Sequence, residues 1–309
     1  MQSPNIRILD FDASVTKQQN LLHKYPHQIV ALQDLAPKAR LWMNKCTRNA
    51  IGERVAKSCR GCVTFLGSGD FHNISPILLE QFQEPISLIV FDFHPDWDIF
   101  PPRFGCGSWV REALKRKNIQ KCLLIGVSSD DISSPWIQSA DLGALNNRRL
   151  EIYPYAHNPS KVFFRKVSKN ISFKTKKGLL DTRIYWEELR NKDLKDYFSS
   201  IIKRLSTKDV YVSIDKDCLD NESALTNWEE GKLTIEQLLL MLQVIKDNLN
   251  IVGVDITGDH SKVTVSGRIK GILSRLDHPK AVKADNTPEG EIIRINELTN
   301  MRILEALFV

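Results

Sequence analysis

The sequence has no long hydrophobic run. Its uninterrupted apolar runs are only a few residues long, well short of the roughly 18 residues that a membrane-spanning helix needs. The first residues, MQSPNIRILDFD, also lack the basic and apolar regions of a secretion signal. We therefore expect a cytoplasmic protein with no membrane partner.

Cysteine is too sparse and too scattered for a disulfide framework. The chain has six cysteines in 309 residues, and Cys59 and Cys62 form its CxxC motif. No second CxxC and no spaced histidine pair completes a zinc site. We expect neither structural zinc nor a redox role for this pair.

Repeats and low-complexity segments are also missing, and the charge is close to balanced. The net charge is +6, and part of this excess lies in KVFFRKVSKNISFKTKKG, residues 161–178. Such a segment contacts nucleic acid or an anionic surface in some proteins, but we favour a solvated basic hairpin. Nucleic acid is therefore not an expected partner.

The chain does contain an alternation of apolar strands and amphipathic helices. We predict strands at residues 6–11, 62–66, 87–93, 121–127, 150–153, 178–181, 209–214 and 251–256. We predict helices at residues 75–82, 108–116, 192–205, 234–249 and within 289–307, and helical structure over 26–58. Several strands are continuous apolar runs, as expected for strands buried on both faces. This pattern predicts one α/β domain, residues 1–309, with three α/β/α layers and a mainly parallel central sheet.

Acid and histidine side chains follow three of these predicted strands. The segments are GSGDFHN at residues 67–73, DFHPDWD at residues 92–98 and SIDKDCLD at residues 213–220. Ligand sites in parallel sheets lie beyond the carboxyl ends of the strands, so the three segments should meet. Alternate side chains of an extended segment point the same way, which should bring Asp92, His94 and Asp96 together. Asp215 and Asp217 should converge for the same reason.

Several carboxylates and a histidine at one place would repel and raise the carboxylate pKa values unless a cation compensates them. A dication is the simplest explanation. Mostly carboxylate ligands with one or two imidazoles suit a hard or borderline ion such as Mn²⁺, and no thiolate set is present for structural zinc. Six candidate ligands favour two ions, because aspartates can bridge a metal pair.

These three segments together resemble the arginase/agmatinase (ureohydrolase) family. Its pattern runs Gly-Gly-Asp-His, Asp-x-His-x-Asp and Ser-x-Asp-x-Asp-x-x-Asp in this order, and the resemblance covers about residues 60–260. It implies an arginase/deacetylase-like fold and two manganese ions. By matching position, the ligands would be His72, Asp92, Asp96 and Asp215 for the first ion, and His94, Asp217, Asp92 and Asp215 for the second. Family members often form trimers or hexamers, and the sequence does not decide whether this chain forms a homo-oligomer.

The resemblance also implies a reaction. A metal-bridging hydroxide would attack the planar carbon of a guanidinium, amidine or amide in a small-molecule substrate and expel an amine. Asp92 and Asp215 would bridge the two ions, and Asp96 would orient the hydroxide.

Three departures from the family pattern bear on catalysis and substrate. One residue separates Asp70 from His72, where the family has Asp and His adjacent. Cys106 takes the place of a histidine that protonates the leaving amine in arginases. A thiol can pass a proton, contact substrate or, at a lowered pKa, attack, but a small loop residue explains Cys106 equally well.

The third departure is Gly258, which stands where arginases place a guanidinium-binding glutamate, with Asp259 one position further on. Asp259, Asn227 and Trp228 are therefore the candidate substrate contacts, although residues 226–229 lack an arginase or agmatinase signature.

Three functions compete. The first is a binuclear-manganese hydrolase of C–N bonds whose substrate is not arginine. The second is a deacetylase-like amidohydrolase with one zinc held by Asp92, His94 and Asp215. The third is a regulatory or binding protein that keeps the fold and metal but has lost turnover, since fold alone does not fix function. We favour the first.

Overall fold

The computed structural model describes residues 5–55, 60–99, 104–137, 139–277 and 286–308. Its main feature is an eight-stranded sheet in the order β2-β1-β3-β11-β10-β4-β5-β6, in which every neighbouring pair is parallel. The strands are β1 Asn5–Asp10, β2 His27–Ala31, β3 Cys62–Gly67, β4 Ile86–Phe91, β5 Ile119–Ile125, β6 Leu150–Tyr153, β10 Asp209–Asp215 and β11 Asn250–Thr257.

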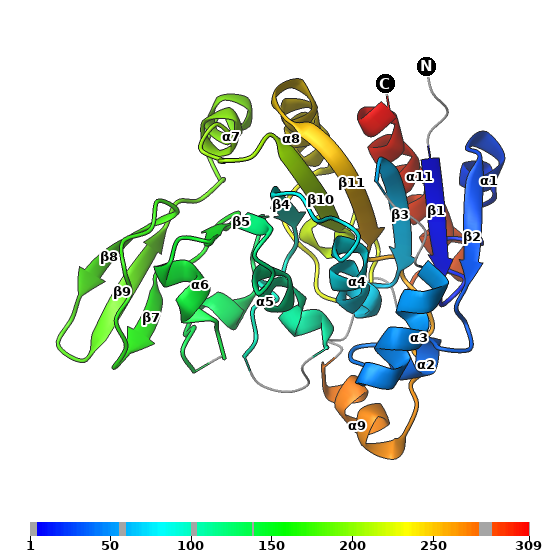
Figure 1. Cartoon of the computed structure of the whole chain (residues 1–309), viewed down its shortest axis with the longest axis horizontal. Coiled ribbons are helices and arrows are strands. Elements are labelled where there is room, and N and C mark those ends of the chain that lie inside the picture. Colours follow the sequence, from blue (N-terminus) through cyan, green and yellow to red (C-terminus); the bar gives the residue numbers. More distant parts are fainter. Residues whose placement is uncertain (1–4, 56–59, 100–103, 138, 278–285, 309) are drawn as a thin grey trace.

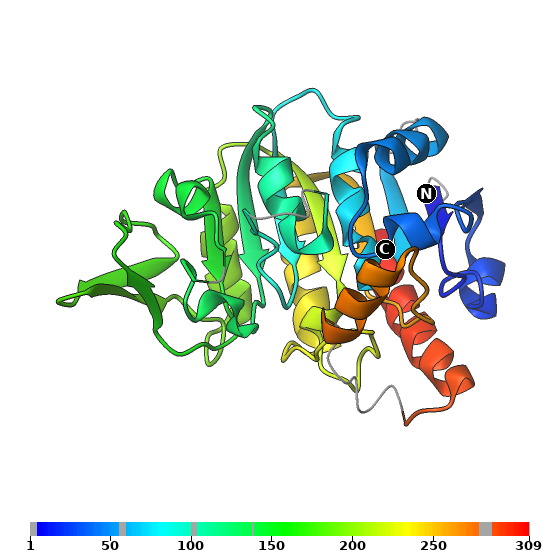
Figure 2. The ribbon, with the colours of Figure 1, turned by 90° about the horizontal axis from the view of Figure 1, so that it is seen from below.

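Helices cover both faces of this sheet (Figures 1 and 2). They are α1 Gln19–Lys24, α2 Ala36–Ala39, α3 Lys45–Val55, α4 Ser75–Leu79, α5 Trp109–Leu114, α6 Leu142–Asn146, α7 Leu194–Ile202, α8 Ile235–Asn248, α9 Arg268–Asp277 and α11 Glu289–Phe308. Short 3₁₀ turns occur at Gly69–Ile74, Cys106–Ser108, Asp130–Ile132 and Lys216–Cys218. The predicted α/β fold with a mainly parallel sheet is confirmed.

Two hydrophobic cores, one on each face of the sheet, hold the layers together. One core packs side chains from α3 to α6 against the sheet, and the other packs α1, α7, α8 and α11 against the opposite face. Strands β3 and β4 are buried at every position, which explains their continuous apolar sequences. Each fully buried Leu, Ile or Val contributes roughly 1.5–3 kcal/mol, so this burial is the main stabilising term.

Local sequence signals explain several element ends. Helix α8 starts with a capping box, in which Thr234 Oγ1 accepts from the Gln237 amide at 3.2 Å and Gln237 Oε1 accepts from the Thr234 amide at 3.1 Å. The predicted strand at 178–181 is wrong, because residues 178–180 form a turn and only Asp181 belongs to the strand that follows, β9 Asp181–Trp186. The helical prediction for 26–58 is wrong at β2, an edge strand whose mixed burial gave no strand pattern.

A second sheet, antiparallel and three-stranded, has the order β7-β9-β8. Its strands are β7 Ser160–Phe163, β8 Phe173–Lys177 and β9 Asp181–Trp186, so the basic segment predicted as a hairpin supplies two of the three. It stands off from the body on the side of β5 and α6 (Figure 1). In the part of the chain that the structure describes, no helix is both long and apolar enough to cross a membrane.

Candidate metal centre and substrate pocket

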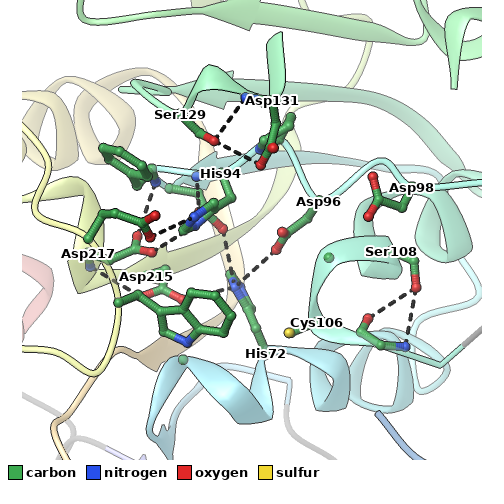
Figure 3. Close-up of a pocket in the computed structure, with 18 of the residues that line it drawn as sticks. His72, His94, Asp96, Asp98, Cys106, Ser108, Ser129, Asp131, Asp215 and Asp217 are labelled. Atoms are coloured by element: carbon green, nitrogen blue, oxygen red, sulfur yellow. Dashed lines mark hydrogen bonds and ion pairs between the residues drawn. The ribbon is translucent and has the colours of Figure 1, made fainter. Parts of the chain in front are cut away.

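The candidate site lies at the carboxyl ends of the four central strands, β3, β11, β10 and β4, which are neighbours in the sheet. Each of these strands is followed by polar residues, and parallel pairing places all four ends at one edge. Figure 3 shows His72, His94, Asp96, Asp215 and Asp217 turned toward one another there. The distant segments singled out in the sequence therefore meet.

The route by which the second segment reaches the site differs from the prediction. Strand β4 ends at Phe91, so the alternation expected through Asp96 does not hold. Asp96 instead has a left-handed backbone with φ of 46°, and its carbonyl accepts the Val110 amide at 3.1 Å in the first turn of α5. The Phe93 amide donates to Asp217 Oδ1 at 3.0 Å. A loop fixed by these contacts, rather than strand geometry, presents the side chains.

The first cluster surrounds His72. Its Nδ1 lies 3.2 Å from Asp92 Oδ2, 3.3 Å from Asp215 Oδ2 and 3.6 Å from Asp96 Oδ2. Neither His72 Nδ1 nor Asp92 Oδ2, both buried, has a hydrogen-bond partner among the described residues. Atoms that bind one ion at about 2.1 Å lie about 3 to 3.5 Å apart, so these spacings fit shared metal coordination.

The second cluster joins the first through Asp92. His94 Nδ1 lies 3.0 Å from Asp217 Oδ2 and 3.9 Å from Asp92 Oδ1. His72, Asp92 and Asp96 form one group with metal-ligand spacing, and Asp92, His94 and Asp217 form another. Because Asp92 turns one oxygen toward each histidine, it is placed to serve two ions. Asp215 belongs to neither group but faces His72.

Outer hydrogen bonds orient both imidazoles in the same way, an arrangement that the sequence did not reveal. Ser213 Oγ donates to Asp255 Oδ1 at 2.5 Å and therefore accepts from His72 Nε2 at 2.8 Å. With Nε2 donating to Ser213, Nδ1 faces the carboxylates. Without a metal ion the raised pKa of His72 keeps a proton on Nδ1, and a bound cation would take the place of that proton. His94 Nε2 likewise lies 3.2 Å from Glu229 Oε2. The Ser-x-Asp spacing was the available signal for Ser213, whereas nothing marked Asp255 or Glu229 in advance.

The pKa shifts show how strongly this group of side chains needs compensation. Burial raises the pKa of Asp96 well above its usual range, and the charge of Asp92 raises it further. Burial, with Asp215 and Asp92, raises the pKa of Asp217 to about 8. Burial alone would lower the pKa of His72, but the carboxylates of Asp215 and Asp92 outweigh it and raise it well above normal. Two dications would relieve this repulsion, and the donor set fits them.

Comparison with known proteins agrees with this arrangement. Residues 13–259 match the model of the arginase family. The chain belongs to the arginase family. An uncharacterized protein of Thermotoga maritima is 26% identical over 260 residues, which cover 84% of this chain and 81% of that protein.

Solved structures share the fold at low sequence identity. An arginase from Bacillus cereus matches with a TM-score of 0.60 at 12% identity, covering 99% of this chain and 97% of that one. A hypothetical agmatinase from Burkholderia thailandensis matches with a TM-score of 0.56 at 16% identity, covering 99% and 86%. The formimidoylglutamase from Bacillus subtilis matches with a TM-score of 0.56 at 13% identity, covering 97% and 87%.

Two predicted substrate contacts of this arginase-family chain lie away from the pocket. Asp259 is 1% exposed, and its Oδ1 lies 2.8 Å from Lys216 Nζ and accepts from Gln18 Nε2 at 2.7 Å. Asn227 accepts from Ser68 Oγ at 3.0 Å and binds the backbone of Ser261. Both side chains are already occupied in holding loops together, which corrects the prediction that they face substrate.

Trp228, the third predicted contact, does line the pocket. Its Nε1 donates to Asp70 Oδ1 at 3.0 Å, and its ring meets the His94 ring edge-on at 5.5 Å. Asp70 also forms a buried ion pair with Arg40 at 2.5 Å. Asp70 therefore holds Trp228 and Arg40 in place, and within this glycine-rich segment only His72 faces the candidate metal cluster.

The pocket is a cavity of about 690 Å³ that opens onto the two clusters. Cys106 is one of the residues that line it. Burial raises the pKa of the Cys106 thiol well above normal, and the charges of Asp96 and Asp70 raise it further. A thiol held protonated in this way can donate a proton or a hydrogen bond. Its pKa is shifted upward, whereas a nucleophilic thiolate needs a lowered pKa. Cys59, half of the CxxC motif, lies outside the described residues.

Proposed function

We propose that this arginase-family protein is a hydrolase of C–N bonds that holds two manganese ions, His72, Asp92, Asp96 and Asp215 binding one and His94, Asp217, Asp92 and Asp215 the other. Its substrate is a guanidino, amidino or amide compound other than arginine. The observation that carries the proposal is the position of Asp92, whose two oxygens face the two imidazoles at 3.2 and 3.9 Å.

When bound, such an ion pair activates water near neutral pH and polarises the carbon under attack. The chain's own residues then divide the remaining work. To Asp96, which lies beside His72 at the first cluster, we assign the orientation of the water and the acceptance of its proton. Cys106 lines the pocket, and its raised pKa keeps the thiol protonated, so we assign it as the donor to the departing amine.

The charge of the pocket supports a cationic substrate without a carboxylate. Four further carboxylates line it, from Asp98, Asp130, Asp131 and Glu229, while none of its lining residues in the described chain is a lysine or arginine. Trp42, Phe93 and Trp228 add aromatic walls, which favour cations as well. An α-carboxylate, as in arginine, would meet repulsion here.

The test is a manganese-replete activity screen over guanidino, formimidoyl and acylamino compounds, scoring release of urea, ammonia and amine. We expect turnover of a cationic member and two manganese ions per chain by elemental analysis. Asp92→Asn should lose both ions, and Asp217→Ala about one. Asp130→Asn, which removes a pocket acid outside both clusters, is the control and should keep two.

Two other outcomes would replace the proposal. One tight zinc per chain, unaffected by Asp217→Ala, would indicate the deacetylase-like alternative. Stoichiometric metal with no turnover anywhere in the panel would indicate a regulatory protein. The regulatory alternative is motivated by two residues. Gly258 offers no side chain where arginases carry their guanidinium-binding glutamate, and Asp259 is paired with Lys216.

A further inference from the structure

The three-stranded sheet β7-β9-β8 carries the positive charge of the molecule. Residues 160–186 contain eight lysines and arginines and one aspartate, whereas the whole chain has a net charge of only +6. The rest of the chain is therefore slightly acidic. Because this sheet stands off from the body (Figures 1 and 2), its charge forms a separate basic surface.

Strand register concentrates these cations on one face. Arg183 of β9 pairs with Lys161 of β7 on one side and with Lys176 of β8 on the other. All three side chains are exposed, while the alternate residues Val162 and Ile184 are fully buried. Like charges directly opposite one another destabilise a sheet. Only Arg183 of this row has an acid nearby, Asp181 at 3.8 Å, within the described residues. The row is therefore open to an external anion.

One end of the same sheet is apolar and uncovered. Leu179 is 97% exposed, Leu180 63% and Phe164 81%. The Phe164 amide donates to the Leu180 carbonyl at 3.4 Å, so the turn between β8 and β9 and the exit of β7 lie together. The buried side chains of this sheet, such as Val162 and Ile184, belong to the core on one face of the main sheet, and these three exposed residues lie outside that core. Neighbouring exposed apolar side chains of this size mark an interaction site.

We propose that this sheet docks the protein on an anionic phospholipid bilayer, with Leu179, Leu180 and Phe164 entering the acyl boundary and the surrounding cations binding lipid headgroups. An apolar tip beside a basic surface has the two components that stable peripheral binding needs. Nucleic acid would satisfy the cations but leave the leucines in water. A second copy, docked sheet to sheet, would oppose two basic surfaces.

The proposal departs from two expectations drawn from the sequence, a basic hairpin that is merely solvated and the absence of a membrane partner. The sequence shows the charge, but only the fold shows that Leu179 and Leu180 lie at a free turn while the apolar partners of the same sheet turn inward. It is independent of the proposed reaction.

The test is co-sedimentation of the full chain with vesicles of phosphatidylcholine containing 30 mol% phosphatidylglycerol, against vesicles of pure phosphatidylcholine. We expect binding to the anionic vesicles that weakens as salt rises, and little binding to the neutral ones. Lys176→Gln/Lys177→Gln should lower the partition coefficient about fivefold per lysine removed. Leu179→Ser/Leu180→Ser should lower it about tenfold or more.

Matched controls remove the same groups elsewhere. Lys45→Gln/Lys208→Gln removes two exposed lysines from other elements, and Leu240→Ser/Leu298→Ser removes two exposed leucines, 38% and 53% exposed, from α8 and α11. Both controls should bind as the native chain does.

Three results would overturn the proposal. The first is equal binding to both kinds of vesicle, or none to either. The second is tight binding of an oligonucleotide that survives Leu179→Ser/Leu180→Ser. The third is a dimer in sedimentation equilibrium that this variant abolishes, which would assign the tip to self-association.

Discussion

Gly258 lies against Asp215 so closely that no side chain fits between them. A Cβ at position 258 would come 2.5 Å from Asp215 Oδ1 and 2.7 Å from the Lys216 amide. The backbone at Gly258 also has φ of 88°, which favours glycine. Gly258 thus lies directly against a candidate metal ligand.

Gly258→Ala should therefore lose metal affinity as well as stability. The control is Gly267→Ala, because Gly267 has a similar φ of 94° but nothing within 4 Å of an added Cβ. We expect both variants to lose about 1 kcal/mol from backbone strain. Only Gly258→Ala should also lose manganese affinity, measured by titration calorimetry. Equal affinity in the two variants would contradict the contact with Asp215.

Ser213→Ala should weaken metal binding without touching a metal ligand. It removes the acceptor of His72 Nε2 and leaves Asp255 without its 2.5 Å hydrogen bond, so the imidazole is free to rotate. Loss of such outer partners typically costs 10- to 100-fold in metal affinity. Ser87→Ala is the control, since Ser87 is equally buried but bonds Thr207 near the amino end of β4. An unchanged manganese affinity in Ser213→Ala would show that His72 is not held in this way.

The central strands of the sheet and the acids that follow them were predictable, because buried parallel strands leave continuous apolar runs. The end of β4 was not predictable, because the alternation of Phe91, Asp92 and Phe93 reads as a continuing strand. In the structure β4 ends at Phe91, and the chain then turns with a left-handed residue at Asp96. Asp259 was misplaced for a related reason. Its partner Lys216 is 43 residues away, and sequence spacing cannot reveal a buried pair of that kind.

Asp259→Asn should act on folding rather than on substrate binding. It leaves Lys216, which is fully buried, without its ion-pair partner at 2.8 Å. Removing one partner of a buried ion pair typically costs about 3–5 kcal/mol. We expect a loss of about this size in the free energy of unfolding, measured with urea. Glu289→Gln, which breaks the exposed pair with Lys17, should change little. If Asp259→Asn were as stable as the native chain and changed KM alone, the substrate role would be restored.

Asp98 should make stability depend on pH in the chelator-treated protein. Burial and the nearby charge of Asp131 raise its pKa from 3.8 to about 7. The folded state then holds this proton more tightly than the unfolded chain does, so the stability it gives is present below pH 4 and is lost as pH rises toward 7. As pH rises from 4 toward 7, the free energy of unfolding of Asp98→Asn should therefore increase by roughly 2 kcal/mol relative to that of the native chain. Urea unfolding in the presence of EDTA measures this difference. Asp130→Asn serves as the control, and an identical gain there would exclude the assignment to Asp98.

Cys106 should resist alkylation, because burial and two carboxylates keep its thiol protonated. The same chain supplies a reference in Cys46, a free cysteine that is exposed on α3. With iodoacetamide at pH 7.5 and peptide mass spectrometry, we expect Cys46 to be modified first and Cys106 at least tenfold more slowly, since only the thiolate reacts. Cys106→Ser should keep the proposed donor and much of any turnover, and Cys106→Ala should lose more. Faster labelling of Cys106 than of Cys46 would instead identify a nucleophile and require a different reaction.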